Sequence, residues 1–134
     1  MKNLLCFLCA LSAVSTAMAQ EVNIKLLGTS DVHGRIVPWS YGADVEDKSG
    51  SYAQIATYVK DVRKNNKNVV LVEVGDAIQD NQIDVFAKDK KYYKDHPIPK
   101  VLNEMKYDVF VLGNHEFNFG MKALDEILKA IKAK

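Results

Sequence analysis

Three short apolar runs, each ended by a glycine and followed at once by polar side chains, organise the sequence. They occupy residues 22–28, 69–75 and 109–113. Four consecutive apolar residues, as at 109–112, are typical of a strand buried on both faces of a sheet. Segments with apolar residues at helical spacing follow or separate these runs, at 51–64, 98–105 and 121–131. This alternation of strands and helices predicts an α/β fold with a parallel sheet.

Two segments lack a clear period. Residues 35–49 contain Pro38, Trp39 and Tyr41 among acidic residues, and we expect a surface loop there. Partial packing is the expected role of its two aromatic side chains, with stacking on a nucleobase as the alternative. Residues 80–93 are mixed and charged, and they predict no more than a short helical turn on a solvated face.

The first 19 residues have the layout of a secretory signal peptide. A single charge at Lys2 precedes an apolar run over 4–14, and small residues end at Ala19. The apolar run is shorter than the roughly 20 residues that span a bilayer, so we expect cleavage after Ala19 rather than a stable membrane anchor. The sequence therefore predicts an exported protein, periplasmic or extracellular, whose single domain begins at residue 20.

Removal of this segment changes the chemistry that is available. Both cysteines, Cys6 and Cys9, lie within it, so any metal in the remaining 115 residues must bind through oxygen and nitrogen. Only one of the 18 basic residues is removed, and the other 17 balance the 17 acidic residues. A net charge near zero predicts no basic face and no nucleic-acid polymer as a partner.

Polar side chains follow each of the three apolar runs. Asp31 and His33 come after the first run, Asp76 after the second, and Asn114 with His115 after the third. Asp31 and His33 are two residues apart, so on an extended segment both side chains point to the same side. Because parallel strands end side by side, we expect all five residues to converge at one edge of the sheet.

This set of side chains suits phosphoryl transfer. Two divalent ions a few ångströms apart, bridged by one carboxylate, can activate a water molecule while they hold phosphate oxygens. Imidazole, carboxylate and amide ligands favour Mn, Zn or Fe-type ions over calcium, which prefers oxygen alone. The identity of the two ions is left open.

Two further polar residues call for an interpretation. Glu73 lies inside the second apolar run, and a carboxylate within a buried strand needs a partner or an edge position, so we expect a structural role, with a role near the site as the alternative. His96 precedes Pro97 at the entry to a helix. We interpret it as a loop histidine, with contact to a substrate as the alternative.

The polar segments also resemble a known family. The stretches T-S-D-V-H-G, V-G-D-A-I-Q-D and L-G-N-H-E-F-N-F-G are similar, in this order and spacing, to the first three signature blocks of the calcineurin-like metallophosphoesterases. Within that superfamily the chain resembles the exported nucleotidases, so the expected fold is part of a metallophosphoesterase sheet sandwich. The resemblance implies that Asp31 and His33 hold one ion, that Asp76 bridges both, that Asn114 binds the second ion, and that His115 is the catalytic histidine.

The departures from the family pattern matter as well. Such enzymes complete the metal site with later histidines and carry a second domain that binds the nucleoside, but no histidine follows His115 here. We therefore expect residues 20–134 to be the amino-terminal portion of a catalytic domain, incomplete at its C-terminal end and inactive without the missing C-terminal part. Asn118 stands where the 5'-nucleotidase branch usually has aspartate, which resembles the cyclic phosphodiesterase branch.

Three hypotheses for function follow. The first is an exported metal-dependent phosphoesterase that hydrolyses small nucleotides, namely 2',3'-cyclic nucleotides and 3'-nucleotides, through a water activated by two metal ions. The second is a 5'-nucleotidase or UDP-sugar hydrolase on the same scaffold. The third is a non-catalytic exported module that binds a metal or a nucleotide. The coding sequence beyond Lys134 would discriminate among them.

Overall fold

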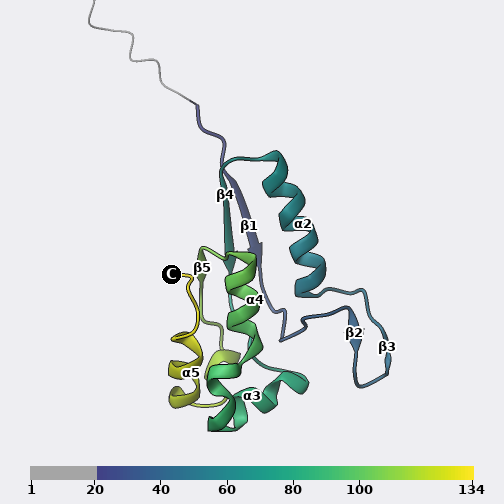
Figure 1. The fold of residues 1–134 in the computed structure, drawn as a ribbon, viewed down its shortest axis with the longest axis vertical. Helices are drawn as coiled ribbons and strands as arrows, with labels where there is room; N and C mark the ends of the chain where they lie inside the picture. The colour runs from purple at the N-terminus through teal and green to yellow at the C-terminus, as the bar shows by residue number, and fades with distance from the viewer. Residues whose placement is uncertain (1–20) are drawn as a thin grey trace, which may run out of the picture.

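A computed structural model describes residues 21–134 of the chain, so the expected signal peptide lies outside the described residues. Its centre is a parallel sheet in the order β1-β4-β5 (Figure 1). The strands are β1 (Lys25–Thr29), β4 (Val69–Glu73) and β5 (Val109–Phe110). These are the three predicted strands, each somewhat shorter than its apolar run. The parallel α/β architecture expected from the sequence is confirmed.

Two helices make the crossovers between the strands. Helix α2 (Tyr52–Asn65) leads from β1 towards β4, and helix α4 (Pro97–Met105) leads into β5. The Ser51 side chain caps α2 by accepting a hydrogen bond from the Gln54 N–H at 3.4 Å, as its sequence position predicts. The two helices contact each other, and both bury apolar residues towards the sheet.

The segment between β4 and α4 consists of short helical turns. It contains a 3₁₀ helix (Gln82–Asp84), helix α3 (Val85–Lys88) and a second 3₁₀ helix (Lys90–Asp95). Helix α5 (Met121–Leu128) packs against α3 and the second of these turns. It ends three residues before the predicted Ile131. The chain then returns to β5, where Lys134 accepts from the Phe110 N–H at 2.9 Å and donates to the Asp108 carbonyl at 3.0 Å.

A two-stranded hairpin was not expected from the sequence. Strands β2 (Trp39–Ser40) and β3 (Val45–Glu46) pair antiparallel in the segment that was predicted to be an irregular loop. Each strand has two residues, too few for an alternating pattern to show. In Figure 1 the hairpin lies away from the three-stranded sheet, beyond the amino-terminal end of α2.

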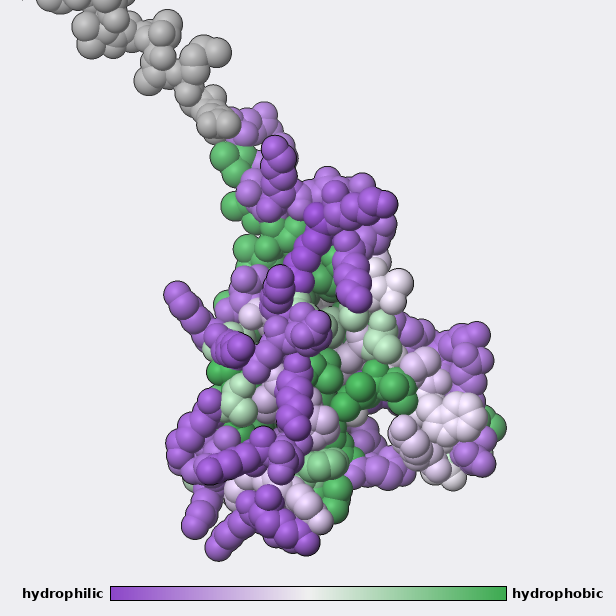
Figure 2. Space-filling model, in the orientation of Figure 1, coloured by the Kyte–Doolittle hydropathy of each residue, from purple (hydrophilic) through white to green (hydrophobic). Residues whose placement is uncertain are grey.

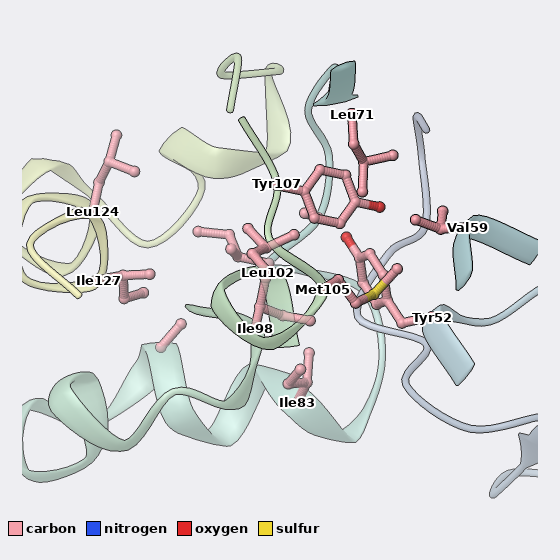
Figure 3. Close-up of a cluster of buried hydrophobic side chains, with 13 residues drawn as sticks. Tyr52, Val59, Leu71, Ile83, Ile98, Leu102, Met105, Tyr107, Leu124 and Ile127 are labelled. Atoms are coloured by element: carbon pink, nitrogen blue, oxygen red, sulfur yellow. The ribbon is translucent and has the colours of Figure 1, made fainter. Parts of the chain in front are cut away.

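The core lies between one face of the sheet and the helices. In the close-up of Figure 3, α4 places its apolar residues at the centre of this cluster, while α5 contributes Leu124 and Ile127 at one side. Leu71 of the central strand and Ile98 of α4 are fully buried. The apolar period of α4 and α5 therefore correctly identified the faces that these helices bury, except at Met121, which is 59% exposed.

A buried polar network crosses this core. Glu73 lies on the central strand with no solvent exposure. Its Oε2 accepts from the Thr29 hydroxyl at 2.7 Å and from the Tyr52 hydroxyl at 2.9 Å, and the Tyr107 hydroxyl lies 2.8 Å from that of Thr29. Burial raises the pKa of the Glu73 carboxyl, although these hydrogen bonds act in the opposite direction. The expected structural role of Glu73 is confirmed.

The opposite face of the sheet is open. Leu26 is 71% exposed, and Val74 and Val111, just beyond the strands, are 50% and 44% exposed. The apolar run at 109–112 predicted burial on both faces, but the described helices cover only one. Figure 2 shows exposed apolar side chains among the polar ones in the upper part of the molecule. Among residues 21–134, no helix has the length and apolar character to cross a membrane.

Candidate metal and phosphoester site

The carboxyl ends of the three parallel strands carry the predicted site residues. Backbone hydrogen bonds join the loops that follow these strands. The Asp31 N–H donates to the Gly75 carbonyl at 3.1 Å, and the His33 N–H donates to the Asp76 carbonyl at 2.9 Å. The third loop is joined through a side chain, because the His115 N–H donates to Asp76 Oδ1 at 2.8 Å. The loops therefore form one connected surface at the edge of the sheet.

Three donor side chains converge on this surface. One ligand atom from each of Asp31, His33 and Asp76 lies within 4.8 Å of the other two, although up to 45 residues separate them in the sequence. His33 Nε2 is 3.9 Å from Asp31 Oδ1, while His33 Nδ1 lies 3.2 Å from the Gln79 carbonyl oxygen. A proton on Nδ1 donated to that carbonyl leaves the Nε2 lone pair available to a cation. Two carboxylates and an oriented imidazole fit a divalent transition-metal ion.

The same residues have an uncommon backbone conformation. Asp31, His33 and Asp76 have φ values of 54°, 49° and 59°. Of the three other residues with positive φ besides glycine, Asp44 lies in the hairpin turn and Lys106 caps the C-terminal end of α4, where this conformation is common. His33 also lies in a tight turn, closed by the Arg35 N–H donating to the Val32 carbonyl at 3.1 Å. Asp31 and Asp76 lie outside such turns and caps, where a positive φ costs on the order of 1–3 kcal/mol and is concentrated at functional sites.

His115 lies beside these donors. Its ring centroid is 5.2 Å from that of His33, with an angle of 71° between the ring planes. Asn118 Nδ2 is 2.9 Å from His115 Nδ1, so the side chain three residues later orients the ring. Asn114 has an exposed side chain and immediately precedes His115 on the same loop. All five predicted residues thus lie at one edge of the sheet, with Asp31, His33 and Asp76 in a common cluster.

Two loops approach each other closely beneath this cluster. Gly75 has a φ of 106°, and a β-carbon there would collide with the backbone nitrogen of Gly113. A β-carbon on Gly113 would in turn collide with the Asp76 carboxylate. The two glycines that end the second and third apolar runs are therefore required for the contact between these loops.

Sequence reasoning missed the roles of two buried residues, Glu116 and His96. Glu116 is fully buried and accepts hydrogen bonds from the loop after β4, a role that its position in the motif did not reveal. His96 lies at the predicted entry to α4, but it is 1% exposed and its Nδ1 accepts from the Ile98 N–H, a buried capping role that the sequence did not reveal. The ring lies edge-on to Phe86, and burial lowers the pKa of His96 to about 4.

A cleft adjoins the cluster. It has a volume of about 850 Å³, and its walls include Asp31 and His33 on one side and Trp39 and Tyr41 of the hairpin on the other. The two aromatic residues are 39% and 63% exposed, which agrees with the partial packing expected from the sequence. Figure 2 shows the hollow between the hairpin and the body of the molecule.

Comparison with known proteins places the site in context. The chain is 38% identical over 119 residues to the trifunctional nucleotide phosphoesterase protein YfkN of Bacillus subtilis, an alignment that covers 83% of this chain and 8% of that protein. It is 37% identical over 128 residues to a 2',3'-cyclic-nucleotide 2'-phosphodiesterase/3'-nucleotidase of Haemophilus influenzae, with 92% and 20% covered. A snake venom 5'-nucleotidase of Naja atra is 34% identical over 113 residues, with 81% and 20% covered. The chain thus spans 20% or less of the length of these curated relatives.

The fold agrees with these similarities. The crystal structure of the calcineurin-like phosphoesterase YfkN from Bacillus subtilis superimposes with a TM-score of 0.76 and 34% sequence identity, covering 82% of this chain and 35% of that one. The family model for calcineurin-like phosphoesterases matches residues 24–132, a range that contains all three polar loops. The chain therefore belongs to the calcineurin-like phosphoesterase family.

Proposed function

We propose that this chain provides the metal-binding edge of an exported nucleotide phosphoesterase that acts on 2',3'-cyclic nucleotides and 3'-nucleotides. The observation that carries the proposal is the convergence of Asp31, His33 and Asp76 within 4.8 Å, beside the ring of His115. Members of this family use divalent metals. Bound divalent ions would supply Lewis-acid activation of a water molecule and charge compensation for the phosphate.

The family resemblance and the positions of the residues together suggest their roles. Asp31 and His33 would hold one ion, Asp76 would serve as a ligand to both ions, and Asn114 would offer its amide oxygen to the second. Asn118 Nδ2 donates to His115 Nδ1, so the neutral ring carries its proton on Nε2. His115 Nε2–H is then suited to donate to a phosphate oxygen or to a leaving oxygen.

The cleft supports a nucleotide as the substrate. Its volume of about 850 Å³ lies in the range of small-molecule sites, and it opens beside the two residues that hold the first ion. We place the base of the nucleotide against the hairpin, where Trp39 and Tyr41 present exposed aromatic rings. The phosphate then lies at the edge of the sheet, within reach of His115.

Two observations favour the cyclic and 3'-nucleotide specificity. One relative named for it is 37% identical to this chain over 92% of its residues. Asn118, which contacts His115, also matches the pattern of that branch rather than the aspartate of the 5'-nucleotidase branch. The similarity to a snake venom enzyme is consistent with export, which residues 1–19 predict.

The test uses the natural polypeptide, expressed as its gene encodes it. With added Mn²⁺ it should hydrolyse 2',3'-cyclic AMP and 3'-AMP faster than 5'-AMP or a UDP-sugar. A clear preference for 5'-AMP would favour the 5'-nucleotidase alternative, and binding without turnover would favour the non-catalytic module.

The 134 residues alone should not hydrolyse nucleotides. Two carboxylates, one imidazole and one amide are fewer protein ligands than two ions require, since each ion is usually held by three or more. An incomplete set of ligands weakens metal affinity and leaves the water poorly activated. Hydrolysis by this chain alone at roughly 1 per second or more would contradict the expectation.

A further inference from the structure

Glu116 receives an unusual set of hydrogen bonds. Its carboxylate is fully buried and accepts from four backbone N–H groups. Asp76 and Gly113 donate to Oε2, each at 2.7 Å. Ala77 and Ile78 donate to Oε1, at 2.7 Å and 3.3 Å. Three of these donors belong to the loop after β4 and one to the loop after β5, so a single side chain joins both loops.

The backbone conformation creates the need for such an acceptor. Positive φ values at Gly75 (106°) and Asp76 (59°) bend the chain sharply after β4. The N–H groups of Asp76, Ala77 and Ile78 all reach the same carboxylate as a result. Successive amides in such a bend form a concave site for an anion. Each buried N–H left without an acceptor would cost about 1–3 kcal/mol. A carboxylate suits this site because both of its oxygens only accept hydrogen bonds.

We propose that Glu116 is a positioning residue that sets the separation between the Asp76 carboxylate and His115. It fixes the Asp76 backbone directly, and Asp76 Oδ1 in turn accepts from the His115 N–H at 2.8 Å. Glu116 also accepts from the Gly113 N–H, which fixes the loop that carries His115. Glu116 therefore acts on the site through the backbone of two loops. The inference rests on the proposed metal site, and it holds for any phosphoester substrate.

The amide variant tests this role specifically. Glu116→Gln preserves the size and shape of the side chain but places an NH₂ group where one oxygen was. Whichever way the amide is turned, its NH₂ group faces two backbone N–H groups, either those of Asp76 and Gly113 or those of Ala77 and Ile78. The loops must then separate or lose two hydrogen bonds.

Glu73 offers a matched control. It is the other buried glutamate of the described residues, but its hydrogen bonds come from the hydroxyl groups of Thr29 and Tyr52. Burial raises the pKa of its carboxyl and so favours the uncharged acid. An uncharged carboxylic acid both donates and accepts hydrogen bonds, as the amide of glutamine does. Glu73→Gln therefore changes a buried carboxyl of the same size that accepts from none of the four N–H groups held by Glu116.

The experiment measures Mn²⁺ binding to the natural polypeptide by titration calorimetry, together with the electron paramagnetic resonance spectrum of bound Mn²⁺ and the melting temperature. Loss of an outer partner of a metal ligand typically weakens affinity 10–100-fold. Glu116→Gln should therefore bind Mn²⁺ roughly 10–100-fold more weakly and change the spectrum. Glu73→Gln should keep the affinity of the wild type. A purely structural role for Glu116 would lower the melting temperature but leave the affinity of the folded protein unchanged.

The outcomes separate the two proposals. If the wild type binds no Mn²⁺, the proposed metal site is wrong. If the wild type binds and Glu116→Gln binds equally well with an unchanged spectrum, the positioning role is wrong. Should the variant not fold, amide hydrogen exchange in the wild type decides the matter. The N–H groups of Asp76, Ala77 and Gly113 should exchange slowly, and exchange as fast as in exposed loops would overturn the inference.

Discussion

Acid should destabilise this protein through His96. The imidazole caps α4 by accepting from the Ile98 N–H at 3.3 Å, which it can do only where Nδ1 carries no proton. Burial of the ring is the main cause of its low pKa, about 4 against an ordinary value of 6.5. The Ile78 backbone and the charge of Asp84 act in the opposite direction but do not prevail. The native protein therefore keeps this ring neutral in mildly acidic solution.

The sign and size of the effect follow from linkage. Between pH 6.5 and pH 4 the unfolded chain takes up a proton at His96 while the native protein does not, so the free energy of unfolding falls as the pH falls. A difference of 2.5 pKa units at 1.36 kcal/mol per unit amounts to about 3 kcal/mol. Stability from this group is complete above about pH 6.5 and is lost on acidification to about pH 4.

A variant isolates this contribution from other titrating groups. Glu73 changes the free energy of unfolding in the opposite direction. Its raised pKa stabilises the native protein at low pH, and this stabilisation is lost as the pH rises above 4.5. His96→Asn keeps an N-cap acceptor for the Ile98 N–H but cannot titrate. It also loses the contact with Phe86, a cost that does not depend on pH.

The assay is urea unfolding followed by circular dichroism, for wild type and His96→Asn, at several values between pH 4 and pH 7. The difference in unfolding free energy between the two proteins should change by about 3 kcal/mol over this range, with the variant relatively more stable at the acidic end. A difference that stays constant within about 0.5 kcal/mol would refute the reasoning, since the buried ring would then not be held neutral.

Three further predictions concern the site. Gly75→Ala should lower the free energy of unfolding by roughly 3 kcal/mol or more, because its φ of 106° is strained for alanine and the new methyl group meets the facing loop; Gly42→Ala, in open space, is the control, and equal urea midpoints would contradict the prediction. Trp39, the single tryptophan of the sequence, should change its fluorescence when 2',3'-cyclic AMP is added but not with ribose 5-phosphate, which lacks a base; an unchanged spectrum would exclude the hairpin as the base site. Asp76→Asn should lower bound metal in the natural polypeptide more than Asn114→Ala, because a bridging carboxylate serves both ions, and equal metal content by elemental analysis would disprove the bridging role.

The sequence by itself determined the main elements and the residues of the candidate site. Apolar runs and helical spacing reflect which side chains face the core, and this information is local, so β1, β4, β5, α2, α4 and α5 were all found. Because the strands are parallel, placing Asp31, Asp76 and His115 after consecutive strands was enough to predict that they meet. The resemblance to a family then assigned roles that local patterns could not.

Only the tertiary structure decided the remaining features, because they depend on contacts between segments distant in the chain. Three of the four partners of Glu116 are backbone amides 38–40 residues away, which have no side-chain signature in the sequence. The neutral state of His96 depends on burial by several packed elements, and the open sheet face depends on which side the helices cover. Residue types and their spacing therefore identify the chemistry of this protein, whereas the register of β4 against β5 sets the geometry in which that chemistry acts.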